Sequence, residues 1–330
     1  MTSKIKQVTF SQYGNPEVLQ VAEVEQPLAK AGEVLVKVSV IGVNYSDVLR
    51  RKNIYFMPTP LPFVLGTEAV GVIEEVGEGV SEPFSVGTRV LAILPQAGGY
   101  ATYVSANAQY CVPLPPTIDD KTATAIFVQG TTAQLMVSQI AKELTDKTVL
   151  VNASAGGVGS ILVQLAKLNG AKVIGASSSD AKLKVATALG ADAGVNYTRD
   201  NWREDVKRAN DGKGVDVVFE MVGGEVYNKS IRSLAPGGHM IVYGCASGIQ
   251  GSIHPEHFVD ENLTQSGFNL AYFIQHKPAV WQKALGTVIE LLAQGKIKIE
   301  TPKTFALEEA AEAHRQIEAR QTTGKVVLLT

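Results

Sequence analysis

The stretch from Thr148 to Leu168 restricts the possible folds more than any other part of the chain. Thr148 to Asn152 is a short apolar run, Ala153 to Gly157 is a loop of small residues, and Val158 to Leu168 places apolar residues at helical spacing. Glycine at such a turn lets the backbone approach a ligand closely, and the first turn of a helix attracts negative charge. The stretch therefore predicts a strand, a phosphate-binding loop and a helix.

Strand and helix patterns continue to alternate beyond this loop. We expect further strands at Lys172–Ala176, Gly194–Tyr197, Val215–Phe219 and Met240–Tyr243. Helical spacing fits between them at Ala181–Leu189, Trp202–Ala209 and Val226–Leu234. Repeated units of this kind predict an α/β fold with a doubly wound parallel sheet covered on both faces.

The first 125 or so residues have a different pattern. Apolar, mostly β-branched runs at Val34–Val40, Ala69–Val76 and Thr88–Leu94 are bounded by glycine and proline. Short strands with such punctuation predict a compact barrel or sandwich. Near the other end we expect a helix at Ala279–Leu292 and a buried strand at Lys325–Leu329.

Composition excludes several classes of protein. Thirty basic residues against 32 acidic ones give a formal charge of −2, whereas a general nucleic-acid binder is usually basic. No apolar stretch reaches the roughly twenty residues that span a bilayer, and the first ten residues lack the apolar core of a secretory signal. Cys111 and Cys245 are too few for a disulfide framework or a four-thiolate zinc site. We expect a cytoplasmic protein with a small-molecule ligand.

The loop itself resembles a dinucleotide fingerprint. Gly156, Gly157, Val158 and Gly159 would hold the pyrophosphate, with Gly159 allowing close packing of helix on strand. Ser154 stands where the first glycine of the usual GxGxxG pattern would be, so the fingerprint is a variant.

The end of the second strand favours NADPH over NADH. Ser177 and Ser178 replace the acid that usually binds the ribose 2′-hydroxyl, and Lys182 follows one turn later. Hydroxyls and a lysine suit a 2′-phosphate. Asp180 opposes this interpretation. The alternative is that Ser177–Ser179 cap the next helix and Lys182 is solvated.

Short motifs along nearly the whole chain resemble the zinc-free quinone oxidoreductase (NADPH:quinone reductase) branch of the medium-chain dehydrogenases/reductases. They are Gly42-Val43-Asn44-Tyr45-Ser46-Asp47, Gly66-Thr67-Glu68-Ala69-Val70-Gly71, Val86-Gly87-Thr88-Arg89-Val90, Gly98-Gly99-Tyr100-Ala101, Gly130-Thr131-Thr132-Ala133, Ala155-Gly156-Gly157-Val158-Gly159, Tyr243-Gly244 and Thr323-Gly324-Lys325-Val326-Val327.

The resemblance implies two domains with a cleft for cofactor and substrate between them. Residues 1–127 and 273–330 would form a GroES-like, β-rich catalytic domain, and 128–272 a Rossmann-like NADP-binding domain. It also implies a homodimer that pairs an edge strand, for which Gly267–Tyr272 is the candidate; a strand internal to one subunit is the alternative.

Zinc-dependent relatives carry a cysteine and a histidine where this chain has Asn44 and Thr67. Neither side chain is a normal zinc ligand, so we expect no metal site, with Glu68 in a structural role. His254 and His257 have HxxH spacing but no third ligand nearby in sequence, and we expect them at the surface.

The resemblance also implies site residues. Asn44 would lie near the nicotinamide and donate to the substrate oxygen, and Tyr55 would supply a hydrogen bond, a proton or a stacking surface. A turn-stabilising role for Asn44 and a packing or gating role for Tyr55 are the alternatives. Further cofactor contacts would come from Thr132, Tyr197, Met221, Tyr243, Gly244, Cys245, Ala246, Phe273 and Arg320.

Without zinc, the hydride acceptor must be electron-poor, which indicates quinones or α,β-unsaturated carbonyls. Tyr45, Tyr55, Phe56, Phe63 and Phe127 would give the site an aromatic lining. An enoyl-thioester reductase, with Arg50, Arg51 and Lys52 as a patch for the acyl carrier, is one alternative; those residues could equally be a solvated charge run. An NADPH-binding structural or redox-sensing protein with little turnover is another.

Overall fold

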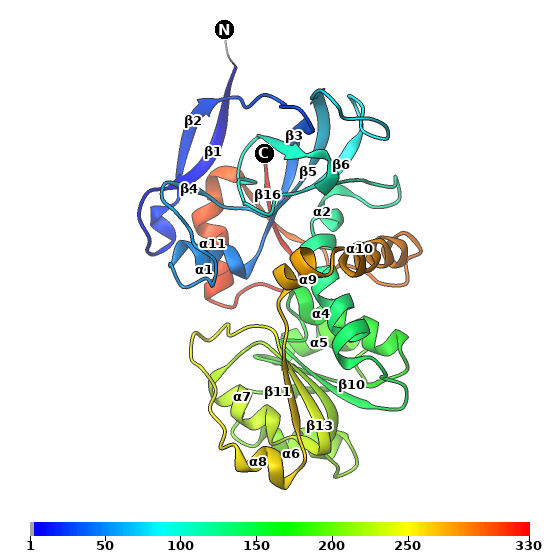
Figure 1. Cartoon of the computed structure of the whole chain (residues 1–330). Coiled ribbons are helices and arrows are strands. Elements are labelled where there is room, and N and C mark those ends of the chain that lie inside the picture. Colours follow the sequence, from blue (N-terminus) through cyan, green and yellow to red (C-terminus); the bar gives the residue numbers. More distant parts are fainter. Residues whose placement is uncertain (1–2) are drawn as a thin grey trace. The chain divides into compact units, whose positions relative to one another are not determined.

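The structure is a computed structural model that describes residues 3–330. The chain forms two compact units. The first unit runs to Val128 and takes in Ile299–Thr330, and the second unit is Gln129–Lys298. Figure 1 shows the elements of each unit.

The second unit is built on a six-stranded sheet in the order β11-β10-β9-β12-β13-β14, with every pairing parallel. The strands are β9 (Thr148–Asn152), β10 (Lys172–Ser177), β11 (Ala193–Asn196), β12 (Val215–Glu220), β13 (Leu234–Val242) and β14 (Thr264–Gly267). The helices are α3 (Thr131–Leu135), α4 (Gly157–Leu168), α5 (Asp180–Ala188), α6 (Trp202–Ala209), α7 (Gly224–Ile231), α8 (Glu256–Asp260), α9 (Leu270–His276) and α10 (Pro278–Ala293). Two π-helical segments, Ile126–Gly130 and Met136–Ala141, flank α3.

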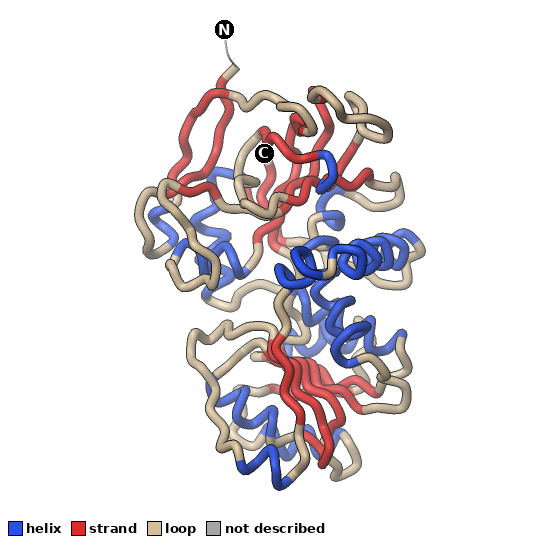
Figure 2. The backbone as a smooth tube through the Cα atoms, in the orientation of Figure 1, coloured by secondary structure: helices blue, strands red, loops and turns tan. Residues whose placement is uncertain are grey.

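Helices cover both faces of this sheet (Figure 2). Leu150 and Val218 on one face pack with Trp202 and Val206 of α6 and Ile231 of α7. The other face carries α4 and α5 (Figure 1). All five residues of β9 are buried, as expected for a central parallel strand. The prediction of a doubly wound parallel sheet is confirmed.

The end of the second unit differs from the sequence-based expectation at two places. Helix α10 packs on α3, so the compact unit extends to Lys298 instead of ending at 272. The expected strand Gly267–Tyr272 is also wrong in its bounds. Strand β14 ends at Gly267, and the Asn269 side chain accepts a hydrogen bond from the Ala271 N–H (2.9 Å) to begin α9.

The first unit contains two sheets. One has the order β15-β16-β3-β5-β6-β8, with β7 paired to β3, and the other has the order β2-β1-β4. The strands are β1 (Lys4–Phe10), β2 (Gln20–Glu25), β3 (Glu33–Val43), β4 (Phe63–Val64), β5 (Glu68–Val76), β6 (Arg89–Ile93), β7 (Tyr103–Asn107), β8 (Cys111–Pro113), β15 (Lys303–Ala306) and β16 (Val326–Leu329). The helices are α1 (Tyr45–Arg51), α2 (Asp120–Ala123) and α11 (Ala310–Glu318). Short 3₁₀ turns lie at Pro16–Val18, Ala108–Tyr110 and Leu307–Glu309.

Strand β3 is the centre of the first unit. It pairs with β5 along one edge; along the other, β7 covers its first half and β16 its second half. Alternate residues of β3 enter one apolar core with Phe10, Leu65 and Phe305. This arrangement brings Lys325, which directly precedes β16, to the end of β3, where Asn44 begins α1.

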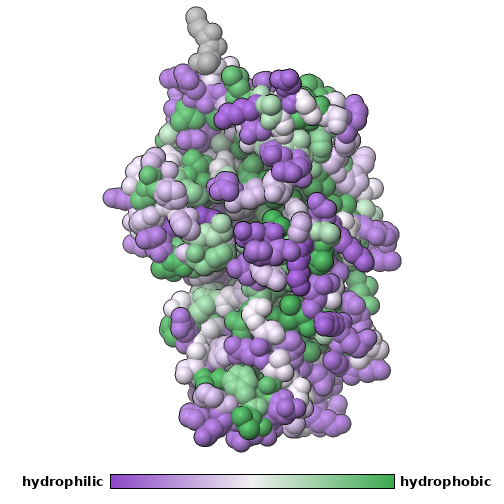
Figure 3. Space-filling view, in the orientation of Figure 1, coloured by the Kyte–Doolittle hydropathy of each residue, from purple (hydrophilic) through white to green (hydrophobic). Residues whose placement is uncertain are grey.

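Figure 3 shows hydrophilic side chains, in purple, spread over the visible face of each unit with apolar residues between them. Phe56 (62% exposed), Ile249 (66%) and Val259 (79%) are among the exposed large apolar side chains. Single exposed apolar residues are ordinary on a globular surface. Within residues 3–330, no helix combines the length and the apolar character that crossing a membrane requires.

Candidate functional site

The loop after β9 has the geometry of a phosphate cradle. Ala153 adopts a left-handed φ of 50°, and its carbonyl accepts the Gly156 N–H at 2.8 Å, which closes the turn. A Cβ on Gly159 would lie 2.2 Å from the Ala153 carbonyl oxygen, so only glycine allows α4 to pack this closely on the loop. Helix α4 begins at Gly157 and presents its free first-turn N–H groups at this point.

Ser154 explains why the fingerprint is a variant. Its side chain is fully buried, and its hydroxyl lies 2.9 Å from the Ser177 hydroxyl and donates to the Ala176 carbonyl at 3.2 Å. The serine therefore ties the phosphate loop to the end of β10. The Ser177 hydroxyl takes part in this internal bond, and its contact with a cofactor stays a prediction.

Gln129 lies against the same loop, at a position that the sequence alone did not assign to the site. A Cβ on Gly157 would lie 2.0 Å from the Gln129 Nε2 atom. The residue is 8% exposed, and its buried Oε1 atom forms no hydrogen bond within the described part of the chain. Gln129 thus fills the space that Gly157 leaves.

The contacts at the end of β10 bear on whether Asp180 disfavours a bound 2′-phosphate. Ser179 caps α5 by accepting the Lys182 N–H (3.4 Å), as the alternative interpretation expected. The Asp180 carboxylate accepts hydrogen bonds from Arg199 (3.0 Å) and Asn196 (3.1 Å). The charge of Asp180 is therefore paired with Arg199, a residue that the sequence did not single out, and opposes a 2′-phosphate less than an isolated acid would.

Two loops at the carboxyl edge of the sheet are joined to each other. Ala246 and Ser247 donate backbone hydrogen bonds to the carbonyls of Met221 and Val222, both at 2.8 Å. Glu220 fixes the first loop, because its buried carboxylate accepts the N–H groups of Val222 (2.8 Å) and Gly223 (2.6 Å).

The second unit brings most of the predicted cofactor residues to this edge of its sheet. Tyr197 follows β11, Met221 follows β12, and Tyr243, Gly244, Cys245 and Ala246 follow β13. Burial raises the pKa of Tyr243 far above its ordinary value, so its phenol stays protonated. Thr132 lies on α3 and Phe273 on α9, where Phe273 stacks on Phe268 at 5.5 Å between ring centroids. Arg320 belongs to the first unit, where it is exposed beyond α11.

Asn44 occupies a buried polar cluster in the first unit. It is the N-cap residue of α1, yet its side chain does not cap that helix. Its Nδ2 atom donates to Glu68 Oε1 at 2.7 Å, and its Oδ1 atom accepts from the Lys325 ammonium at 3.0 Å. Lys325 and Glu68 are themselves joined by an ion pair and are both fully buried.

The Glu68 carboxylate also holds local backbone, because its Oε2 atom accepts the Val128 N–H at 3.1 Å. Its partner Lys325 is the residue that sequence reasoning missed. A lysine at the start of a buried apolar strand was the available signal, since a buried ammonium requires an acceptor.

A second buried cluster adjoins the first through Asp47. Its carboxylate accepts the Asn44 N–H (2.9 Å) and the Gly66 N–H (3.3 Å), and the Tyr100 hydroxyl lies 3.4 Å away. Tyr100 also contacts His314 Nε2 at 3.0 Å. Burial raises the pKa of Asp47 to about 6 and lowers the pKa of His314 to about 3, the latter assisted by Arg51.

Tyr55 lies beside a buried arginine. The Arg50 guanidinium carbon is 4.7 Å from the Tyr55 ring centroid and 5.4 Å from that of Phe63, and Nη1 donates to the Pro58 carbonyl at 3.2 Å. Burial raises the pKa of Tyr55 despite the opposing charge of Arg50, so Tyr55 is protonated at neutral pH.

The alternative of a surface patch formed by Arg50, Arg51 and Lys52 is not supported. Arg50 and Arg51 are buried. Arg51 pairs with the Glu318 carboxylate at 2.7 Å, and Lys52 forms an ion pair with the same carboxylate. Neither a solvated charge run nor an acyl-carrier patch describes these residues, because two of the three charges are used inside the unit.

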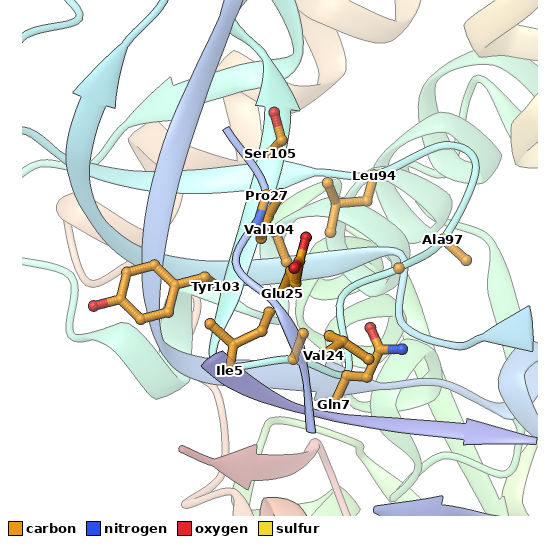
Figure 4. A pocket seen from close by; sticks show the side chains of 12 residues that line it. Ile5, Gln7, Val24, Glu25, Pro27, Leu94, Ala97, Tyr103, Val104 and Ser105 are labelled. Carbon is orange, nitrogen blue, oxygen red and sulfur yellow. The ribbon is translucent and has the colours of Figure 1, made fainter. Parts of the chain in front are cut away.

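The aromatic residues expected to line the site differ in exposure, and a lining shared by all of them stays a prediction. Phe63 packs edge-on against Phe10 (6.1 Å) and Phe127 is buried, whereas Phe56 is largely exposed. A cavity of about 300 Å³ opens elsewhere in the first unit, between β1, β2 and β7 (Figure 4). None of the predicted site residues lines it.

The chain matches two family models, the alcohol dehydrogenase GroES-like domain at residues 30–116 and the zinc-binding dehydrogenase model at 157–290. In the second region, as in the rest of residues 3–330, no three His, Cys, Asp or Glu side chains gather so that they could hold a metal ion.

Similar proteins match over nearly the full length. A 2-haloacrylate reductase from Burkholderia is 35% identical, with 96% of each chain covered. A quinone oxidoreductase from Pseudomonas aeruginosa is 33% identical over 98% of this chain and 99% of its own. The crystal structure of Escherichia coli quinone oxidoreductase complexed with NADPH has a TM-score of 0.89 at 31% identity, covering 98% of this chain and all of that one. The chain therefore belongs to the quinone oxidoreductases of the medium-chain dehydrogenase/reductase superfamily.

Proposed function

We propose that this protein is an NADPH-dependent oxidoreductase that reduces quinones or α,β-unsaturated carbonyl compounds without zinc. The observation that carries the proposal is the glycine-lined loop between β9 and α4, in a chain whose relatives include a quinone oxidoreductase complexed with NADPH. NADPH supplies a hydride from its nicotinamide ring when bound.

The second unit would hold this cofactor. The first-turn N–H groups of α4 and the backbone of Gly156–Gly159 bind the pyrophosphate, and Ser178 and Lys182 bind the 2′-phosphate. The pairing of Asp180 with Arg199 supports this assignment, because a paired carboxylate repels a phosphate less than an isolated one. Thr132, Tyr197, Met221, the Tyr243–Ala246 loop, Phe273 and Arg320 are the remaining proposed contacts.

Zinc independence is supported by donor chemistry. The amide of Asn44 and the hydroxyl of Thr67 are poor zinc ligands, and the nearby Glu68 carboxylate already accepts the Lys325 ammonium. The residues present do not fit a zinc site, and the proposed reaction uses none.

An acceptor in this site must spread negative charge over its own atoms. A quinone takes up one hydride and one proton to give a hydroquinone, and an enone takes up both across its double bond. Asn44 would donate to the acceptor oxygen as charge develops on it. Tyr55 keeps its proton at neutral pH and would deliver it to the product.

Reduction of a 2-haloacrylate is a second candidate, favoured by the 35% identity to a 2-haloacrylate reductase. The reaction adds hydride and a proton across the double bond and yields a 2-halopropanoate. Enoyl-thioester reduction loses support, because Arg50 and Arg51 are buried within the first unit.

The test measures NADPH oxidation from the loss of its absorbance. The acceptors 1,2-naphthoquinone, a 2-alkenal and 2-chloroacrylate are assayed in parallel, and NADH is the cofactor control. Quinone turnover with NADPH and little with NADH is the expected result. Turnover of 2-chloroacrylate alone would move the assignment to the second candidate. NADPH binding without oxidation in any arm would overturn both and favour a cofactor-binding protein.

We also propose a cytoplasmic homodimer. Strand β14 supports it, because this strand ends the sheet order of the second unit and pairs with β13 alone among the described strands. Light scattering coupled to size-exclusion chromatography should give twice the chain mass, and a monomer at micromolar concentration would contradict the dimer.

A further inference from the structure

The Asn44 side chain is held by one hydrogen-bond donor, the Lys325 ammonium, and one acceptor, the Glu68 carboxylate. Lys325 contacts its Oδ1 atom at 3.0 Å, and Glu68 contacts its Nδ2 atom at 2.7 Å. An ammonium only donates hydrogen bonds and a carboxylate only accepts them. The amide can satisfy both partners in one orientation and neither in the flipped one, so the ion pair fixes which end of the amide is oxygen and which is nitrogen.

The partners are themselves fixed in place. Glu68 Oε2 is bonded to the Val128 N–H at 3.1 Å, which leaves Oε1 for Asn44 and Lys325. Gly42 leaves room for this carboxylate, because a Cβ there would lie 2.5 Å from Glu68 Oε1. Glu68 and Lys325 are 0% exposed and Asn44 is 5% exposed, so water competes little with these bonds.

The hydrogen-bond count defines what Asn44 can still offer. One of its two Nδ2 hydrogens is bonded to Glu68, and the other forms no hydrogen bond within the described first unit. We infer that Lys325 and Glu68 are positioning residues that lock the Asn44 amide so that its free N–H, and not its carbonyl oxygen, faces the substrate oxygen. This inference rests on the proposed function of Asn44.

Two double variants, each of similar side-chain size and unchanged net charge, separate two features of the cluster. The first feature is the lock, meaning the hold of Lys325 and Glu68 on the Asn44 amide, and the second is the donor, meaning the free N–H of that amide. Lys325→Met with Glu68→Gln keeps Asn44 but removes the lock. The glutamine introduced in place of Glu68 accepts the Val128 N–H with its oxygen and turns its NH₂ toward Asn44, which favours the flipped amide. Asn44→Asp with Glu68→Gln keeps a fully bonded cluster of unchanged net charge but removes the free N–H. In this second variant, Lys325 and the introduced glutamine both donate to the introduced aspartate.

The matched control makes the same replacements in an exposed lysine–glutamate pair that joins β3 and β5. Lys37 on β3 lies 3.5 Å from Glu74 on β5, and the side chains are 59% and 41% exposed. The double variant Lys37→Met with Glu74→Gln should retain the activity and stability of the wild type, because exposed pairs contribute little.

Each variant is assayed for quinone-dependent kcat, for quinone KM and for the Kd of NADPH by fluorescence. We expect kcat to fall roughly 100-fold without the donor and at least about 10-fold without the lock, because oriented donors stabilise developing charge. The Kd of NADPH should change less than about two-fold in both, since the phosphate-binding residues are untouched. In ¹⁵N spectra of Asn-labelled protein, the Asn44 side-chain signal, identified by its loss in Asn44→Asp, should shift when the lock is removed.

The outcomes distinguish the inference from the function on which it rests. Unchanged kcat in the Asn44→Asp double variant would refute the proposed role of Asn44. A loss there, with wild-type kcat in the Lys325→Met double variant, would overturn the positioning inference alone. If the Lys325→Met double variant does not fold, the single variant Lys325→Arg provides the test. Arginine also only donates hydrogen bonds, so kcat should stay within about ten-fold of wild type. A larger fall in kcat, in a protein that melts cooperatively and whose Asn44 signal is unshifted, would refute the positioning role of Lys325.

Discussion

At the scale of single residues, the Asp47–Tyr100–His314 cluster couples stability to pH in two opposite directions. Asp47 has a pKa of about 6 in the fold against an ordinary 3.8, so between these values the folded protein binds the extra proton and acidification stabilises it. His314 has a pKa of about 3 against an ordinary 6.5, so the unfolded chain binds the extra proton and acidification destabilises the fold. The His314 shift is the larger, and stability should fall below pH 6.5.

Replacement of His314 by glutamine should flatten this acid-side loss, because the amide does not titrate. Between pH 7 and pH 4 the variant should lose about 2–3 kcal/mol less unfolding free energy than the wild type. Urea unfolding at several pH values measures it. Asp47→Asn is the matched comparison and should steepen the loss; identical slopes in all three proteins would show that neither group controls stability.

Lys182 provides a residue-scale test of the cofactor assignment. Lys182→Ala should raise the KM for NADPH roughly ten-fold and leave kcat nearly unchanged, because one charge-assisted contact to the 2′-phosphate is lost. The KM for NADH should not move. Lys184→Ala, an exposed lysine on the same helix, is the control. An unchanged NADPH KM in the Lys182 variant would remove this residue from the site.

At the scale of elements, β3 and β5 must approach closely for Glu68 to reach Asn44. Gly42→Ala would place a methyl group 2.5 Å from Glu68 Oε1, so the carboxylate has to move. We expect a lower Tm and a lower kcat together, measured by calorimetry and the quinone assay. Gly286→Ala, at an exposed position of α10 with open space around it, should instead stabilise by about 0.5–1 kcal/mol. A Gly42→Ala protein with wild-type Tm and kcat would contradict the close approach.

Local sequence was enough to predict the helices and strands whose apolar residues recur at helical or strand spacing. The predicted bounds of β9 are those observed, and α4 is one residue longer than its apolar spacing indicated. The phosphate loop and the parallel sheet follow from this period together with glycine placement. Burial of Arg51 could not be predicted in the same way, because its partner Glu318 is 267 residues away in sequence and only the tertiary fold brings the two together.

The parts of the candidate site that are local turns, such as the phosphate loop, could be predicted from the sequence. The role of Lys325 could not, since Lys325 and Asn44 are 281 residues apart in sequence and no local pattern relates them. The start of α9 was missed for a smaller reason. A single side-chain cap at Asn269 ends the extended chain two residues after β14.

At the scale of the whole molecule, the first unit depends on a segment far along the chain. Removal of Val326–Thr330 would leave the second half of β3 without its β16 partner and expose apolar residues of the core. We expect the first unit of such a truncated protein to lose its cooperative unfolding. Circular dichroism and hydrogen exchange measure this loss. Slow exchange retained throughout β3 would show that β16 is dispensable.

The pairing of Lys325 with Glu68 also has a consequence for the order of events during protein synthesis. Glu68 leaves the ribosome 257 residues before Lys325. Until then its carboxylate lacks the ammonium that accompanies it in the interior, so we expect the nascent first unit not to close its sheet around Glu68. The second unit ends at Lys298 and is complete earlier. The growing polypeptide should therefore acquire its nucleotide-binding half first and assemble the surroundings of Asn44 only after Lys325 has emerged.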